Sequence, residues 1–141
     1  MLLRAIIDTN VFLSALHSTR GAAFQIFAEL RRGRWQMVLS NHLVFEYEEI
    51  AKQKAAKMGL TPTAVDDVLD ALCAGAEQHH LKSAWVPVLI DPDDEPLLQM
   101  AVEARVAIIV TRNIRHLKPA ERFGIELLRP AEFLATIRKT L

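Results

Sequence analysis

The sequence predicts an α/β domain built on a mostly parallel β-sheet, and three observations support this prediction. Strand-like and helix-like segments alternate along all 141 residues. Two apolar runs, residues 2–7 and 106–110, are almost uninterrupted, which is typical of strands buried on both faces of a parallel sheet. No linker, repeat or low-complexity tract interrupts the pattern, so we expect residues 1–141 to form a single domain.

The first part of the chain predicts a strand, two helices and a second strand. After the run at residues 2–7, apolar residues recur at the spacing of one helix face and predict helices over residues 11–16 and 21–32. Gly33 is a typical helix stop. The apolar run at residues 35–39 then predicts the second strand of the sheet.

The middle of the chain predicts two long helices and a third strand. Ser40 suits the N-cap of a helix that ends at Gly59, because its hydroxyl can accept a hydrogen bond from the first turn. Thr61 is followed by a proline, a common way for a helix to begin, and we expect that helix to reach about Leu81. Residues 84–90 are predicted as the third strand.

An acidic turn at residues 91–96 introduces the last part of the chain. It leads into a helix whose apolar face is formed by Leu97, Leu98, Ala101 and Val102. The strand at residues 106–110 follows this helix. A short strand at residues 125–128 and a helix from Pro130 onward complete the expected fold.

Composition argues against several classes of protein. Lysine plus arginine equals aspartate plus glutamate, so the chain lacks the strong basic excess of many nucleic-acid binders. The only cysteine, Cys73, has no disulfide partner and no companion at metal-ligand spacing, which favours a reducing, cytoplasmic location. The apolar stretch near the N-terminus is much shorter than the roughly 20 residues of a membrane span, so we expect a soluble protein with no membrane partner.

Three acidic residues far apart in the sequence are expected to meet in space. Asp8 directly follows the first strand, Glu46 lies on the long helix after it, and Asp94 falls in the first turn of a later helix. Ligands of parallel α/β sheets bind beyond the carboxyl ends of the strands, where these side chains can converge. Carboxylates that share a cleft repel one another unless cations join them, and a set of oxygen ligands suits Mg²⁺ or Mn²⁺.

Each acid also has a simpler structural explanation. Asp8 could cap the helix that follows it, and Glu46 or Glu49 alone could be a solvated helix position. Asp91, Asp93 and Glu95 could simply compensate the dipole at the start of the next helix and bind no metal. The histidines show no metal-ligand spacing, and we expect surface or capping roles for His17, His42, His79, His80 and His116.

Four short motifs occur in an order that resembles the PIN domain family. They are Asp8-Thr9-Asn10-Val11, Ser40 with Glu46-Tyr47 six residues later, Asp91-Pro92-Asp93-Asp94, and Val110-Thr111-Arg112-Asn113. The chain resembles the VapC-like toxin components of toxin–antitoxin systems, and this resemblance covers essentially its whole length, as far as residues 130–134. This resemblance implies a PIN-like three-layer α/β/α sandwich with a mostly parallel sheet of about five strands, and a ribonuclease activity that depends on Mg²⁺ or Mn²⁺. It also implies a cognate antitoxin as partner and a homodimer.

The resemblance assigns roles to individual residues. Asp8, Glu46 and Asp94 match the family's metal-binding acids, although the third acid could be any of residues 93–95, because helix starts are poorly defined by sequence. Asn113 stands where many relatives carry a fourth acid. Its carbonyl oxygen can bind a cation but brings no charge, so a second metal would be held less firmly. Residues that could compensate are Glu49, Asp91, Asp93 and Glu95.

The expected reaction is hydrolysis of a phosphodiester in RNA. Asp8 and Asp94 would hold the metal, and Glu46 would position or deprotonate the attacking water. Residues expected to support the site or to bind substrate are Asn10, Thr111, Arg112 and Arg115, with His116 and Lys118 nearby. Ordinary solvated surface is an equal alternative for Arg112, Arg115, His116 and Lys118. It is the favoured interpretation of a second basic cluster, which comprises Arg31, Arg32 and Arg34 beside Trp35. Single-stranded RNA suits the cleft, because a flexible strand can bend into it.

Two other functions compete with this hypothesis. A phosphatase of the haloacid dehalogenase type also carries an aspartate after its first strand, but it needs a second aspartate two residues later, where this chain has Asn10. A catalytically silent PIN-like module that only binds proteins is the stronger rival. Asn113 removes one acidic ligand, and the net charge of zero offers no general attraction for RNA.

Overall fold

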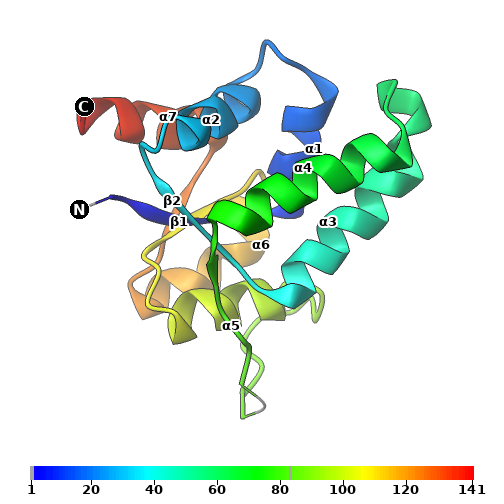
Figure 1. The fold of residues 1–141 in the computed structure, drawn as a ribbon. Helices are drawn as coiled ribbons and strands as arrows, with labels where there is room; N and C mark the ends of the chain where they lie inside the picture. Colours follow the sequence, from blue (N-terminus) through cyan, green and yellow to red (C-terminus); the bar gives the residue numbers. More distant parts are fainter. Residues whose placement is uncertain (1, 83) are drawn as a thin grey trace.

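Five parallel strands form a sheet in the order β3-β2-β1-β4-β5. The computed structural model describes residues 2–82 and 84–141 (Figure 1). The strands are β1 Arg4–Ile7, β2 Gln36–Leu39, β3 Glu77–Gln78, β4 Ile108–Val110 and β5 Glu126–Leu128. Because all strands run in the same direction, their carboxyl ends, and the residues that follow them, lie along one edge of the sheet.

Helices cover both faces of the sheet and produce three α/β/α layers. Figure 1 shows α5 and α6 on one side of the strands and α1, α2 and α7 on the other. The α-helices are α1 Thr9–His17, α2 Ala22–Arg31, α3 Asn41–Lys54, α4 Pro62–Gly75, α5 Glu95–Glu103, α6 Ile114–Leu117 and α7 Pro130–Lys139, with 3₁₀ helices η1 Ala56–Met58 and η2 Lys118–Phe123. Among the described residues, no helix combines the length and the apolar character needed to cross a membrane.

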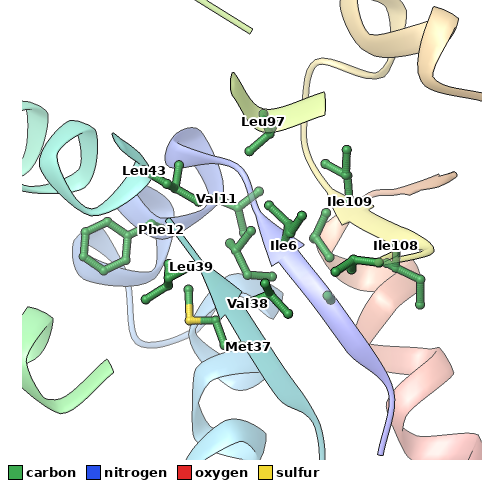
Figure 2. Close-up of a cluster of buried hydrophobic side chains, with 14 of the residues drawn as sticks. Ile6, Val11, Phe12, Met37, Val38, Leu39, Leu43, Leu97, Ile108 and Ile109 are labelled. Atoms are coloured by element: carbon green, nitrogen blue, oxygen red, sulfur yellow. The ribbon is translucent and has the colours of Figure 1, made fainter. Parts of the chain in front are cut away.

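The central strands are buried, which explains their continuous apolar sequence. Ile6 and Ile109 are fully inaccessible to solvent, and Figure 2 shows them in one cluster with side chains from the neighbouring strand and helices. Phe12 of α1 stacks on Tyr47 of α3 with ring centroids 4.3 Å apart. The Tyr47 hydroxyl donates a hydrogen bond to the backbone carbonyl of Ile7. This contact anchors α3 against the end of β1.

Several predicted boundaries are confirmed by the hydrogen bonds that define them. Ser40 caps α3, since its Oγ accepts a hydrogen bond of 3.2 Å from the backbone N–H of Leu43. Thr61 caps α4 in the same way, accepting from the N–H of Ala64 at 3.0 Å. Gly59 follows η1 with a φ of 71°, a left-handed conformation that favours glycine and ends the helical segment.

The prediction of the third strand is wrong, and so is the predicted end of the helix before it. That helix, α4, ends at Gly75, and the third strand is the short β3 that follows, within the range predicted to be helical. Arg4 of β1 donates hydrogen bonds to the Glu77 carboxylate and holds β3 at the edge of the sheet. The backbone N–H of His79 then donates to the carbonyl of Leu39 at 2.8 Å.

Residues 84–90 form an extended loop instead of a strand. The carboxylate of Glu95 accepts hydrogen bonds from the N–H groups of Val88, at 2.6 Å, and Leu89. Proline at position 87 has no N–H to contribute to a sheet. Since a side chain takes up the N–H groups of this segment, they are not available for pairing with another strand.

Candidate functional site

Asp8 lies between the end of β1 and the start of α1, where it has two structural roles. Its Oδ1 accepts a 2.8 Å hydrogen bond from the backbone N–H of Thr9 and thereby caps α1. Its Oδ2 accepts hydrogen bonds from the Thr111 hydroxyl at 2.7 Å and from the Asn10 amide at 3.3 Å. Burial raises the pKa of Asp8 above its usual value, although these hydrogen bonds oppose the shift. The capping explanation therefore holds, but it involves only one of the two carboxylate oxygens.

Asp8, Glu46 and Asp94 line the same small cavity. Its volume is about 10 Å³, close to the space that one water molecule needs. Asp8 follows β1, Glu46 projects from α3, and Asp94 is the residue immediately before α5. The other residues that line the cavity are Ser40, His42, Leu43, Asp93, Pro96, Leu97 and Met100. Three acids that are remote in sequence thus meet at the carboxyl edge of the sheet.

The carboxylates of this cavity influence one another electrostatically. The pKa of Asp94 is raised to about 6, first by burial and then by the negative charges of Asp8, Asp91 and Glu46, while His116 opposes the shift. Burial also raises the pKa of Glu46; nearby Thr9 and His42 lower it, whereas the charges of Asp8 and Asp93 raise it further. At neutral pH the cavity therefore concentrates negative charge that a cation would neutralise.

The donor set of the cavity fits a hard divalent cation. Its candidate ligands are carboxylate oxygens, and the buried Thr9 hydroxyl near Glu46 has no hydrogen-bond partner within the described residues. Among these residues, no three His, Cys, Asp or Glu side chains are close enough together to hold a metal ion as they stand. Mutual repulsion keeps ionised carboxylates apart, and Mg²⁺ commonly takes only one or two protein carboxylates and keeps several waters. The residues fit the ion by their chemistry, without a preformed cage.

Asn113 does not join the acids. Its side chain is exposed and does not line the cavity, whereas its backbone N–H donates a 2.9 Å hydrogen bond to the Thr111 hydroxyl. Thr111 itself has no exposed surface, so it orients Asp8 and cannot contact substrate directly. The Asn10 side chain links these segments, because its Oδ1 accepts a 3.4 Å hydrogen bond from the N–H of Arg112.

The two predicted basic clusters differ in their surroundings. Arg112 and Arg115 are exposed and form no ion pair within the described chain. Arg32 and Arg34, in contrast, bind the buried carboxylate of Glu29 at 2.6 and 2.8 Å. The neighbouring Trp35 is 1% exposed and donates its indole N–H to the carbonyl of Ile26. Arg32, Arg34 and Trp35 therefore make contacts within the fold, which favours a structural role for the second cluster over a substrate contact.

Two histidines lie beside the acids. His42 lines the cavity, and His116 lowers the pKa of Asp94. The sequence prediction gave His42 only a surface or capping role, although its position four residues before Glu46 on the same helix places both on one face. His116 was expected near the substrate-binding residues, but the short α6 helix that carries it was not predicted.

The three candidates for the third acid are separated by their contacts. Asp93 and Asp94 line the cavity, whereas both oxygens of Glu95 accept hydrogen bonds from the loop at residues 84–90. Glu49 and Asp91 do not line the cavity, although the charge of Asp91 acts on Asp94. Of the acids that could compensate for Asn113, only Asp93 therefore borders the cavity.

Residues 4–115 match the family described as PIN domain. This range contains β1 to β4, all the residues that line the acidic cavity, and the first two residues of α6. The last strand, β5, and α7 follow it. No curated protein matches the chain.

Proposed function

The chain belongs to the PIN domain family, and from this premise we propose that it is a Mg²⁺- or Mn²⁺-dependent endoribonuclease. Membership of the family indicates a nuclease-type function and binding of nucleic acid. The observation that carries the finer proposal is the shared cavity of Asp8, Glu46 and Asp94. Side chains of this kind, at the carboxyl edge of a parallel sheet, are suited to hydrolysis of a phosphodiester bond.

The proposed roles follow from the environment of each acid. Asp8 and Asp94 would hold the divalent ion, with Asp93 as a further oxygen ligand at the same cavity. A bound ion would activate water and neutralise the charge that develops on the leaving oxygen. Glu46 is the candidate general base, because its raised pKa makes it a better proton acceptor than an ordinary glutamate. The Thr111 hydroxyl would keep Asp8 in position.

We propose single-stranded RNA as the substrate and a toxin–antitoxin pair as the biological setting. The narrow acidic cavity favours a flexible strand over a stiff duplex. The toxin role, a cognate antitoxin, a homodimer and a cytoplasmic location are supported by the VapC-like order of the motifs. A silent protein-binding module remains the second candidate, because Asn113 is exposed and adds no ligand to the cavity.

Asp8→Asn and Asp94→Asn test the proposal. RNA cleavage would be measured with Mg²⁺, with Mn²⁺ and with EDTA, and thermal unfolding would be followed in parallel. Both variants should lose metal-dependent cleavage. The unfolding midpoint of Asp94→Asn should stay level or rise, because repulsion between carboxylates is relieved. Asp8→Asn should lower the midpoint, because both oxygens of Asp8 accept hydrogen bonds and an amide would direct its N–H₂ group at one of the donors; circular dichroism checks that this variant is folded. Asp67→Asn is the matched control, since this exposed aspartate of α4 lies outside the cavity.

Two results would contradict the proposal. If both variants cleave RNA like the parent protein, the assignment of these acids is wrong. If Mn²⁺ neither stabilises the parent protein nor supports cleavage, the chain is the silent module. A ligand that binds only the folded state must raise the unfolding midpoint, so the second measurement does not depend on the choice of RNA.

A further inference from the structure

A second cavity lies beside the acidic one and has the opposite electrostatic character. Its volume is about 520 Å³, and it lies between the end of α1, the start of α2, the end of α3 and Arg112. Figure 1 shows the α1–α2 connection and the far end of α3 on the same side of the molecule. We call this cavity the basic groove. The residues on which its chemistry depends are Lys54, Lys57, Arg112, Leu13 and Met58.

The cations of the basic groove are available for a ligand. Lys54, Lys57 and Arg112 are exposed, and none of them forms an ion pair within the described residues. By contrast, Lys52 on the same helix pairs with both Glu48 and Asp66. Among the residues that the structure describes, no carboxylate lines the groove. Because the chain as a whole has no net charge, three free cations in one hollow create a local attraction for anions.

The groove also offers apolar surface between these charges. Leu13 of α1 and Met58 of η1, both partly exposed, form part of its lining. A small inorganic anion would not use this surface. A single-stranded nucleic acid would use both parts, because its phosphates contact cations while its unpaired bases pack on apolar or polarisable side chains.

Two structural links join the basic groove to the acidic cavity. Helix α1 begins directly after Asp8 and contributes Leu13 and His17 to the groove; at 1.5 Å per residue, His17 lies about 12 Å along the helix from its start. Arg112 is joined to Asp8 by two hydrogen bonds through the side chain of Asn10, of 3.4 and 3.3 Å. A strand whose phosphate lies at the mouth of the acidic cavity could therefore continue along α1 towards the groove.

We propose that the basic groove binds the segment of single-stranded RNA adjacent to the bond that is cleaved. Lys54, Lys57 and Arg112 contact its phosphates, and the apolar lining receives a base. This inference rests on the proposed nuclease function, which it extends by giving the direction in which the substrate leaves the acidic cavity. It also explains how a protein with no net charge and an acidic catalytic cavity attracts a polyanion.

The test uses the double variant Lys54→Gln/Lys57→Gln and a fluorescein-labelled single-stranded oligoribonucleotide in EDTA, which prevents metal-dependent cleavage. Fluorescence anisotropy over a range of salt concentrations gives the affinity and its salt dependence. The double variant should bind roughly tenfold more weakly at low salt, and its slope of log affinity against log salt should be shallower by about 1.4, since each phosphate contact on a single strand contributes about 0.7. With Mg²⁺, KM should rise while kcat is unchanged.

Arg138→Gln/Lys139→Gln is the matched control, because it removes the same charge from the exposed end of α7, outside the groove. This variant should keep the parent affinity and salt slope. Both replaced lysines of the groove are exposed, so the variant should fold normally, and circular dichroism of each variant would check this. Arg112→Gln should weaken binding in the same direction as the lysine variant.

The proposal is overturned if the groove variant keeps the parent affinity, salt slope and KM, in which case the groove serves a protein partner or none. It is also overturned if the α7 control loses as much affinity as the groove variant. These outcomes differ from failure of the nuclease proposal. If the nuclease proposal fails, the parent protein cleaves no RNA with any metal. The binding comparison in EDTA then still decides whether the groove holds nucleic acid.

Discussion

The hydroxyl of Thr111 donates a 2.7 Å hydrogen bond to Oδ2 of Asp8 across 103 residues of sequence. The two residues follow β4 and β1, which are neighbours in the sheet. The N–H of Asn113 donates to the same hydroxyl, so the hydroxyl proton is directed at the carboxylate. Thr111 therefore determines how the central acid of the cavity is oriented.

Thr111→Val should reduce both stability and activity. Valine keeps the shape of threonine but removes a hydrogen bond to a charged group and leaves the Asn113 N–H without its acceptor. We expect a loss of about 1.5–3 kcal/mol in the free energy of unfolding, measured by urea denaturation, and a fall in kcat/KM for metal-dependent cleavage. Thr111→Ser keeps the hydroxyl and should retain most of both properties. A valine variant equal to the parent in both measurements would refute this role.

Asp94 should make the stability of the metal-free protein depend on pH. The pKa of Asp94 in the folded state is about 6, above the usual 3.8, so the folded state holds this proton more tightly than the unfolded chain does. The corresponding stability is present below about pH 4 and is lost as the pH rises through 6. Relative to Asp94→Asn, the parent protein in EDTA should lose roughly 1–2 kcal/mol over this interval, because its partly exposed carboxylate keeps some solvation.

Thermal unfolding midpoints measured in EDTA from pH 4 to 7 check this prediction. The difference between the parent and Asp94→Asn should change in favour of the variant as the pH rises. Addition of Mn²⁺ at neutral pH should reverse the difference, because only the parent gains from neutralisation of the carboxylate. Two curves that stay parallel over the whole interval would contradict the prediction.

Glu95→Gln should loosen the loop at residues 84–90. The carboxylate accepts hydrogen bonds from the Trp85 indole at 2.8 Å and from two backbone N–H groups, and an amide would direct its own N–H₂ group at one of these donors. We expect a loss of about 1–3 kcal/mol, faster hydrogen exchange at Val88 and Leu89, and a red shift of Trp85 fluorescence in a Trp35→Phe background. Glu126→Gln, at an exposed glutamate of β5, is the control.

Low pH should weaken the contact between the Glu95 carboxylate and the loop at residues 84–90. Although burial raises the pKa of Glu95, the hydrogen bonds from Trp85, Leu89 and Val88 lower it to below its usual value of 4.5. A lowered pKa means that the stabilisation is present above about pH 4.5 and is lost as the pH falls below it. The Trp85 emission of the parent should therefore shift at low pH, while that of Glu95→Gln should not respond. Identical acid titrations of the two proteins would exclude this explanation.

Arg32→Gln/Arg34→Gln should affect the fold and leave nucleic-acid binding unchanged. Both arginines bind the buried Glu29, and the hydrogen bond from Arg34 holds the pKa of Glu29 below its usual value. Removing them leaves a buried charge unpaired, so the unfolding midpoint should fall. Affinity for the oligonucleotide should stay at the parent value. The exposed neighbour Arg31 provides a control, Arg31→Gln, that should change neither property. A loss of affinity without a change in the midpoint would restore the substrate role.

The elements that sequence predicted correctly are those with strong local signals. Uninterrupted apolar residues marked β1 and β4, and side-chain hydroxyls at Ser40 and Thr61 marked the starts of α3 and α4. Such signals are readable because a cap bond joins residues that are close in sequence, and because a strand buried on both faces must be apolar at nearly every position, whichever elements cover it. The expectation that Asp8 would cap a helix holds for the same reason.

The errors arose where a side-chain contact overrides the pattern of apolar residues. The loop at residues 84–90 has an apolar sequence, yet Glu95 takes up the N–H groups that a strand would need. Arg4 pairs with Glu77 and draws a predicted helical segment into the sheet as β3. Neither contact has a signature in sequence spacing, because each depends on how the chain returns to itself.

The sequence by itself determined the α/β alternation, the buried strands, the helix caps and the three acids at strand and helix ends, since these follow from local periodicity, capping and motif order. Only the tertiary structure decided that Asp93 and Asp94 line the cavity while Glu95 holds a loop, that Asn113 lies outside it, and that free cations gather beside it. The physical reason is that burial and charge depend on the atoms that surround a side chain, and most of those atoms come from remote parts of the chain.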